Sequence, residues 1–222
     1  MIKAVLFDFD ETLQDRTAAF EKYMDSFLSC YCPGLSSEEI EKRKEDMRIT
    51  GNGGYVNRVE WCKQLCEMWN WADAPAPEEL AYHYDKTFGD HNVIFPNSPV
   101  LLKKLKELGY IVGVITNGPS MLQNHKMDTS GLRPYCDIVV VSGDVGVHKP
   151  DPQLFIYTAE KLGLKPEECV YVGDHPVNDI QGALSAGMKA IRMNTGWFKN
   201  RDLRPDVPVI EDIIDVLKCL NR

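Results

Sequence analysis

Short, strongly apolar runs alternate with segments of helical period through most of this 222-residue chain, and this alternation limits the possible folds more than any other feature. The runs are rich in Val and Ile and end in acidic or small polar residues. Strands buried on both faces of a parallel sheet have this length and composition. We therefore predict an α/β fold with right-handed crossovers, and the predicted strands are Ala4–Phe9, Ile111–Ile115, Ile138–Val141, Val170–Val172 and Ala190–Met193.

The segments between the runs carry signals that begin and end helices. Residues 98–109 and 151–163 each open with a polar residue followed by proline, and each closes with glycine. Proline is favoured in the first turn of a helix, and glycine is favoured just past the last turn. Both ranges are therefore predicted helices, and Asn178 is expected to cap a third.

Residues 15–97 show helical patterns only. Apolar and aromatic side chains recur there at helical spacing, which is typical of residues that pack into a core. Ser36 and Glu39 have the spacing of a capping box. The sequence thus predicts an α/β core domain of residues 1–14 and 98–222, into which an all-helical domain of residues 15–97 is inserted.

The composition excludes several classes of protein. Hydrophobic residues make up 44% of the chain and charged residues 26%, which are values of a globular protein. The formal charge of −8 argues against broad contact with nucleic acid or an anionic membrane surface, although a small anionic substrate can bind at a locally positive site. No segment approaches the roughly 20 apolar residues of a membrane span, and Asp8 comes too early for a signal peptide. We therefore expect a cytoplasmic protein.

Acidic residues stand at the end of the first predicted strand and directly after it. Asp8 and Asp10 are two positions apart, so in an extended chain their side chains point the same way. The carboxyl end of a parallel strand faces the crevice where α/β folds bind ligands. Two carboxylates placed there repel each other unless a cation lies between them or one of them holds a proton. By itself the pair fits either a functional site or a solvated turn whose acids cap a helix.

Polar residues also stand at or near the ends of later strands. Thr116 and Asn117 offer donors to phosphate oxygens. Lys149 is followed by Pro150 and Pro152, which stiffen the backbone just before a helix. Asp174 and Asp179 are oxygen ligands of the kind that Mg²⁺ prefers. Taken singly, these residues equally fit an ordinary turn, a solvated lysine and an acid at a helix N-terminus.

In chain order the four positions form an acid pair, a Thr-Asn step, a lysine and a second acid pair. This order resembles the haloacid dehalogenase (HAD) superfamily, in which the similar motifs are Asp8-x-Asp10-x-Thr12, Thr116, Lys149 and Gly173-Asp174-x₄-Asp179. The resemblance covers nearly the whole chain, because residues 15–97 are similar in placement and texture to the family's type-one cap. It implies a Rossmann-like core with a helical cap domain. Glu11 departs from the Gly or Asp that the family often has at that position.

The resemblance also implies a Mg²⁺-dependent phosphatase that acts on a small phosphorylated metabolite. Asp8 is then the nucleophile that forms an aspartyl phosphate, and Asp10 is the acid and base. Mg²⁺ is expected on Asp8, the Asp10 carbonyl oxygen and Asp174, with Asp179 close by or acting through water. The groups expected to bind phosphoryl oxygens are the backbone N–H of Phe9 and the residues Thr116, Asn117 and Lys149.

Three other activities stay open. A phosphomutase would share every core residue and differ in the cap. A 2-haloacid dehalogenase uses the same first aspartate but differs at the second acid and needs no Mg²⁺, so Asp10 and the pair Asp174 and Asp179 favour phosphoryl transfer. A non-catalytic phosphorylation sensor carries similar residues in another chain order.

The sequence leaves the substrate and the oligomeric state open. Arg48 and Arg58 flank a glycine-rich loop, and they fit either substrate contact or a solvated helix face. The roles of His148 and His175 are also open.

Overall fold

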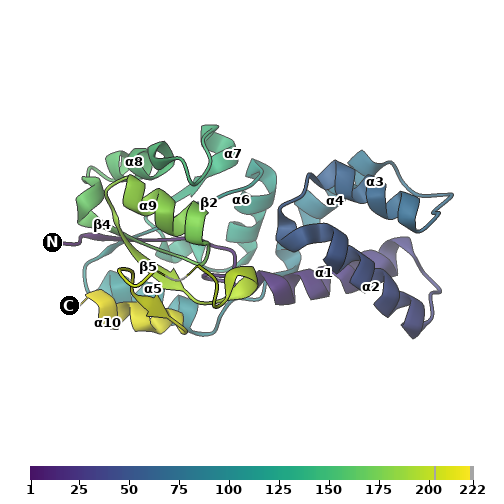
Figure 1. Ribbon diagram of the computed structural model, residues 1–222, viewed down its shortest axis with the longest axis horizontal. Helices are drawn as coiled ribbons and strands as arrows, with labels where there is room; N and C mark the ends of the chain where they lie inside the picture. The colour runs from purple at the N-terminus through teal and green to yellow at the C-terminus, as the bar shows by residue number, and fades with distance from the viewer. Residues whose placement is uncertain (203, 221–222) are drawn as a thin grey trace. The chain divides into compact units, whose positions relative to one another are not determined.

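The computed structural model describes residues 1–202 and 204–220. The chain divides into two compact units, of which one comprises Met1–Arg16 and Asn92–Arg222 and the other Thr17–His91 (Figure 1). The first division follows Arg16, two residues after the predicted boundary at 14. The second precedes Asn92, six residues before the predicted boundary at 98. The connecting segments pair with each other inside the first unit, where the Asp15 N–H donates to the Val93 carbonyl oxygen at 2.8 Å.

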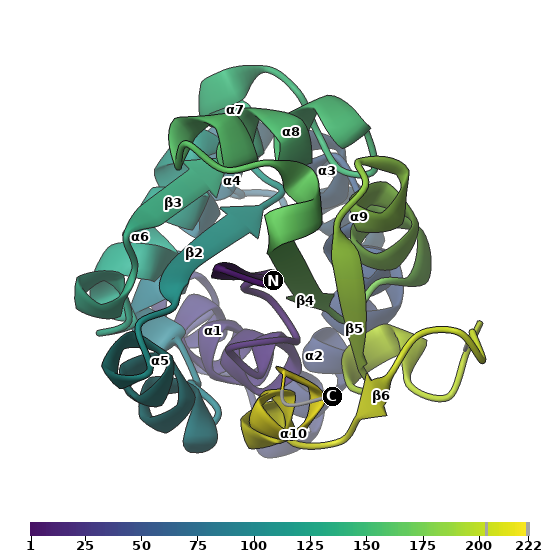
Figure 2. The same cartoon turned by 90° about the vertical axis from the view of Figure 1, so that its left-hand side faces the viewer.

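The first unit is built on a six-stranded sheet whose order is β3-β2-β1-β4-β5-β6, and every neighbouring pair is parallel. Figure 2 shows this sheet with helices on both faces. The α/β fold class is thereby confirmed. The sixth strand was not predicted, because two residues carry no readable period. The strands are β1 (Ala4–Phe7), β2 (Ile111–Thr116), β3 (Ile138–Val141), β4 (Cys169–Gly173), β5 (Lys189–Met193) and β6 (Val209–Ile210).

The central strand β1 supplies residues to both hydrophobic layers, because successive side chains of a strand point to opposite faces. Val5 and Phe7 belong to the cluster that includes residues of α5 (Asn97–Glu107) and α10 (Val216–Leu220). Ala4 and Leu6 belong to the opposite cluster, with residues of α8 (Pro152–Lys161) and α9 (Gly182–Ser185). All four β1 residues are fully buried. This burial fixes the end of β1, and therefore Asp8, within the sheet.

The segment after β4 corrects one expectation. His175 caps it in place of Asn178, since the His175 side chain accepts the backbone N–H groups of Val177 and Asn178. Pro176 then begins a π-helix over Pro176–Gln181, which α9 continues. Two further helices complete the unit, α6 (Ser120–Thr129) and the short α7 (Ser142–Val145).

The second unit is formed by helices, with no strand among its residues 17–91. The predicted capping box is confirmed, because Ser36 and Glu39 exchange side-chain and backbone hydrogen bonds at the start of α2. Buried aromatic side chains such as Tyr23, Trp61 and Tyr84 form its core. The helices are α1 (Arg16–Tyr31), α2 (Ser37–Gly51), α3 (Arg58–Met68) and α4 (Pro77–Thr87).

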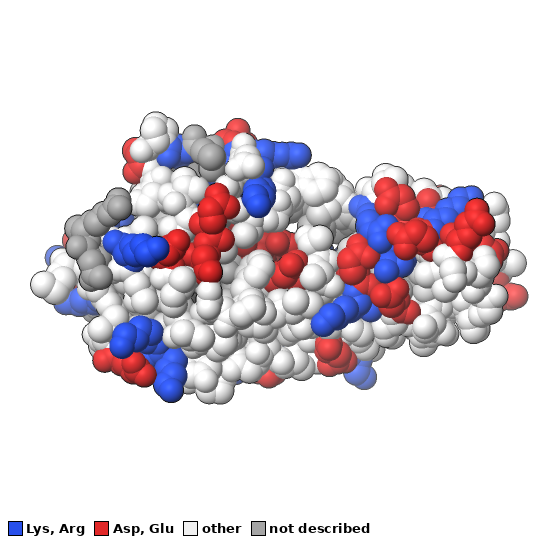
Figure 3. Space-filling view, turned by 90° about the horizontal axis from the view of Figure 1, so that it is seen from below, with Lys and Arg blue, Asp and Glu red and all other residues white. Residues whose placement is uncertain are grey.

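Several charged side chains of the second unit pair with one another. Arg48 donates to both carboxylate oxygens of Glu21, at 2.6 and 2.8 Å, and to Glu41 and Glu45. On the face shown in Figure 3, basic and acidic side chains are intermingled in the same way. These contacts give Arg48 a structural role between α1 and α2. None of the described helices is long and apolar enough to cross a membrane.

Candidate active site

The predicted site residues come together at the carboxyl edge of the sheet because of the strand order. β1 pairs with β2 on one side and with β4 on the other. Asp8 follows β1, Thr116 ends β2 and Asp174 follows β4, so these side chains stand on three adjacent strands. The chain reverses its direction of winding between β1 and β4, and this is where open α/β sheets bind ligands.

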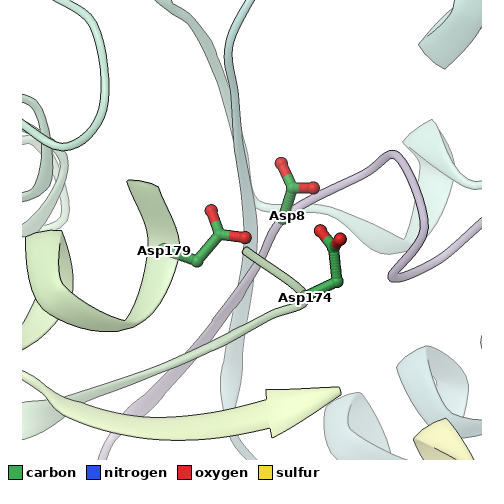
Figure 4. A group of neighbouring side chains, drawn as sticks. All are labelled: Asp8, Asp174 and Asp179. Carbon is green, nitrogen blue, oxygen red and sulfur yellow. The ribbon is translucent and has the colours of Figure 1, made fainter. Parts of the chain in front are cut away.

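Three carboxylates form a buried cluster in this crevice. Asp8, Asp174 and Asp179 each offer an oxygen, and these oxygens lie within 4.8 Å of one another. Figure 4 shows the three side chains directed toward a common space. The backbone of Gly173 makes the approach possible, since a Cβ there would lie 2.5 Å from Asp179 atoms. The Asp179 side chain also accepts the His175 N–H at 2.8 Å, which fixes its orientation.

A single lysine stands among these acids. Lys149 Nζ lies 2.6 Å from Asp8 Oδ1, 2.7 Å from Asp179 Oδ1 and 2.9 Å from the Tyr171 hydroxyl. The three acceptors match the three hydrogens of an ammonium. The Tyr171 hydroxyl donates to the Ile115 carbonyl oxygen at 2.8 Å, so its lone pairs are left to accept from Lys149. A phosphoryl oxygen would therefore have to replace one of these three partners.

Burial and crowding shift the protonation of the cluster. Burial, followed by Asp179 and Asp10, raises the pKa of Asp8 to about 7 against the opposing pull of Lys149. Burial and the neighbouring carboxylates also raise the pKa of Asp174 well above its ordinary range. The pKa of Lys149 lies above its ordinary value, because Asp179 and Asp8 outweigh the effect of burial. Three carboxylates around one ammonium thus form a site that favours a further cation.

This donor set fits a hard divalent cation. All three residues of the cluster offer oxygen, and no cysteine or histidine of the described chain joins the cluster. Carboxylate oxygens are preferred by Mg²⁺, whereas soft metals select thiolate and imidazole. The carboxylate of Asp10, the fourth predicted metal residue, lies outside the cluster. Asp10 is therefore expected to bind the metal through its backbone carbonyl oxygen alone.

Asn117 holds the loop that carries Lys149. Its side-chain amide donates to the Lys149 carbonyl oxygen, and its side-chain oxygen accepts the Lys149 N–H, each at 2.9 Å. This reciprocal pair ties the end of β2 to the start of α8. In the structure the Asn117 side chain therefore orients Lys149, and the phosphate contact expected of Asn117 stays a prediction. The Phe9 ring lies in the core, so only its backbone N–H remains for a phosphate.

The second acid of the first motif is bonded on both oxygens. Asp10 Oδ1 accepts from Gln14 Nε2 at 2.5 Å and from Lys126 Nζ at 2.6 Å, and Lys126 also contacts Oδ2. Burial alone would raise the pKa of Asp10, but Lys126 and Arg16 reverse that effect and lower it to about 2. The carboxylate is therefore ionised at neutral pH in this arrangement, which is the form that accepts a proton.

Several residues of the site were missed by sequence reasoning, among them Gln14, which donates to Asp10, and Gln123, Lys126 and Tyr171. Gln123 and Lys126 lie on α6, where Gln123 Nε2 donates to Thr116 Oγ1 at 2.5 Å and to the Asn117 carbonyl oxygen at 2.9 Å. Tyr171 is an interior residue of β4. The only sequence signal was the spacing of Gln123 and Lys126 by three, which places both on one helix face.

The side chains of other candidate residues are not part of the acidic cluster. His148 is exposed, and the His175 ring lies 4.1 Å from the Phe198 ring while it caps the π-helix. The Arg58 guanidinium stacks 3.6 Å from the centre of the Tyr84 ring in the second unit. These contacts give His175 and Arg58 structural partners.

The strand order and the acidic strand ends define a Rossmann-like α/β enzyme with an acidic active site. The chain belongs to the haloacid dehalogenase-like hydrolase family, whose model matches residues 5–193. The resemblance drawn from the four motifs is thus confirmed.

Relatives and solved structures agree with this assignment. The chain is 32% identical over its full length to the full-length glyceraldehyde 3-phosphate phosphatase of Methanopyrus kandleri. It is similar to the crystal structure of a HAD phosphatase from Thermococcus onnurineus, with a TM-score of 0.66 and 29% identity over 99% of this chain and 98% of that one. A 2-haloacid dehalogenase from Pseudomonas syringae also matches, with a TM-score of 0.67 and 28% identity over 100% and 99% of the two chains.

Proposed function

We propose that the chain is a phosphatase that hydrolyses a small phosphate monoester through an aspartyl phosphate on Asp8. The observation that carries this proposal is the position of Asp8 at the end of the central strand, between the Lys149 ammonium at 2.6 Å and the carboxylates of Asp174 and Asp179. The full-length relative named as a glyceraldehyde 3-phosphate phosphatase supports a small phosphorylated metabolite as the substrate.

In the first step an Asp8 oxygen attacks phosphorus, and the bond from phosphorus to the ester oxygen breaks. Lys149, the Thr116 hydroxyl and the Phe9 N–H stabilise the negative charge on the phosphoryl oxygens. The leaving alkoxide takes a proton from Asp10. Because Asp10 is ionised in this structure, that proton has to arrive with the substrate, and a phosphate monoester whose second pKa is about 6 can carry it.

In the second step water attacks the phosphorus of the aspartyl phosphate and releases inorganic phosphate. Asp10 takes a proton from that water as it attacks, and its ionised form is ready for this role. The bond between Asp8 and phosphorus breaks, which restores the free carboxylate. Asp10 thus serves both steps, once as a donor and once as an acceptor.

The acidic cluster is proposed as a Mg²⁺ site. Asp8, Asp174, Asp179 and the Asp10 carbonyl oxygen would hold the ion. Bound Mg²⁺ supplies positive charge that lets an anionic phosphate approach an anionic carboxylate. Lys149 adds to this charge and keeps Asp8 and Asp179 apart from each other.

We further propose that the helical unit of residues 17–91 serves as the cap domain. Its helix-only content and its insertion between β1 and β2 support this role. A cap excludes bulk water during phosphoryl transfer and admits water for hydrolysis.

A panel of phosphate monoesters with Mg²⁺ tests the proposed function. The panel holds glyceraldehyde 3-phosphate, phosphoserine, phosphoglycolate, a sugar phosphate and a nucleoside monophosphate. The haloacid 2-chloropropionate is assayed beside it as a dehalogenase substrate. Release of inorganic phosphate from at least one ester, without chloride release, is expected. Chloride release alone would favour the dehalogenase, and a phosphorylated product in place of free phosphate would favour the phosphomutase.

A further inference from the structure

Lys126 is a buried cation to which the proposed mechanism assigns no role. Its side chain is only 2% exposed, and its ammonium contacts both carboxylate oxygens of Asp10. The two residues are 116 positions apart, so the fold brings α6 to the end of β1 to make this contact. The Phe9 ring lies beside the same ammonium, with its centre 5.5 Å away.

Such a placement is costly unless the charge is used. Burying an ammonium removes its hydration, and a well-packed apolar residue of similar volume often stabilises a core equally well or better. A helix residue that only filled space at this position would be apolar. The ion pair is also one-sided: the Lys126 side chain is enclosed, whereas 22% of the Asp10 side chain remains exposed. Lys126 therefore contacts the carboxylate from the protein interior, while part of the Asp10 side chain stays accessible to solvent.

Gln123 makes a contrasting set of contacts from the same face of α6. Its amide donates to Thr116 Oγ1 and to the Asn117 carbonyl oxygen, and only more weakly, at 3.3 Å, to Asp10 Oδ2. Gln123 therefore serves mainly the strand end that is proposed to bind phosphate. Lys126 contacts the proposed acid and base.

We propose that Lys126 is the positioning residue of Asp10: its buried ammonium holds the carboxylate in the one orientation that serves both the leaving oxygen and the attacking water. This inference rests on the proposed phosphatase function. Loss of Lys126 would leave the carboxylate with the neutral amide contacts of Gln14 and Gln123, which hold its orientation less firmly than an ion pair does. Because the ion pair of Lys126 is with Asp10, its loss should act on turnover and leave phosphate affinity unchanged.

The test compares Lys126→Met with Lys103→Met, a matched control at an exposed position of α5. Steady-state phosphate release gives kcat and KM, and inhibition by inorganic phosphate reports phosphate affinity. For Lys126→Met we expect kcat to fall roughly 10- to 100-fold, a part of the roughly 10²–10⁴-fold that acid–base catalysis supplies. KM and phosphate inhibition should match those of the control. An unchanged kcat, or a loss that lies entirely in KM, would overturn the proposal.

A second pair of variants keeps the test decisive if Lys126→Met fails to fold. Asp10→Asn removes the charge that Lys126 neutralises, so Asp10→Asn with Lys126→Met contains no unpaired carboxylate at this position. If Lys126 acts through Asp10, adding Lys126→Met to Asp10→Asn costs no further turnover of p-nitrophenyl phosphate. A further loss as large as in the wild-type background would overturn the proposal. If the wild-type enzyme and the Lys103→Met control release no phosphate from any ester, the proposed phosphatase function itself has failed, which is a separate result.

Discussion

Lys149 Nζ lies 2.6 Å from Asp8 Oδ1 although 141 residues separate the two in the chain. The same ammonium contacts Asp179 and the Tyr171 hydroxyl. The Lys149 ammonium therefore holds Asp8, the proposed nucleophile, and lies between it and the carboxylate of Asp179.

The first prediction concerns this ammonium. Lys149→Met leaves Asp8 and Asp179 buried without their shared cation, so we expect kcat/KM for phosphate release to fall at least about 100-fold. Lys149→Arg should not restore activity, because a planar guanidinium cannot match three acceptors arranged around a point charge. Steady-state kinetics measure both variants, with Lys103→Met as the control. Activity of Lys149→Met within a few-fold of wild type would contradict the role of Lys149.

The second prediction concerns the metal. Chelation should abolish phosphate release, and added Mg²⁺ should restore it. Mg²⁺ should also raise the thermal midpoint of the wild-type protein, because it offsets repulsion within the acidic cluster. Asp174→Asn should lose much of this thermal shift, whereas Glu160→Gln, at an exposed position of α8, should keep it. A thermal midpoint that Mg²⁺ leaves unchanged in the wild-type protein and in both variants would contradict Mg²⁺ binding at the cluster.

The third prediction concerns the backbone beneath the cluster. A Cβ at Gly173 would meet Asp179 atoms at 2.5 Å, so Gly173→Ala has to displace the Asp179 side chain. We expect a loss of about 1–3 kcal/mol in the free energy of unfolding together with a clear loss of turnover. Gly51→Ala is the matched control, because its new methyl would meet neighbours at the ordinary distance of 3.7 Å. Equal activity and equal stability of the two variants would contradict this reading of Gly173.

Some of this site is predictable from sequence because each strand and loop that carries an acid has a local sequence pattern. Asp8 and Asp174 directly follow apolar strands, and in a parallel sheet those strand ends meet at one edge. Asp179 follows Asp174 at the spacing of a short loop. Sequence reasoning therefore brought the three acids together, as the structure does.

The missed residues show the limit of such reasoning. Lys126 and Gln123 lie within a helix, and nothing in their spacing tells which partner that helix face meets. Asp10 is 116 residues away from Lys126, so only the packed fold makes the pair. The contact of the Tyr171 hydroxyl with Lys149 could not be predicted either, because an aromatic residue in an apolar strand is typical of a core.

The fourth prediction concerns pH and stability at the edge of the sheet. The Asp137 carboxylate accepts from the Val112 N–H at 2.8 Å and from Lys106. Although burial acts in the opposite direction, these contacts lower its pKa. Because the folded-state pKa is lowered, the stabilisation exists above the unfolded pKa of about 4 and disappears as the pH falls through the folded value.

Asp137→Asn should therefore destabilise the protein at pH 7 by about 0.5–1.5 kcal/mol. The gain from Lys106 is small, because the Asp137 side chain is 35% exposed and solvent screens the pair. Urea unfolding of wild type and variant at about pH 7 and about pH 3 measures the difference, which should shrink at the lower pH. A difference that grows on acidification would contradict the assignment.

The fifth prediction addresses the covalent intermediate, which is the central claim. The wild-type enzyme is mixed with a good ester substrate and Mg²⁺, quenched in acid within the first turnover, and reduced with borohydride, which converts an aspartyl phosphate to homoserine. We predict homoserine at position 8 in the wild-type protein and none in Asp8→Asn, which should also show no turnover. Turnover of Asp8→Asn at the wild-type rate, or a phosphoryl group trapped on another residue, would contradict the account.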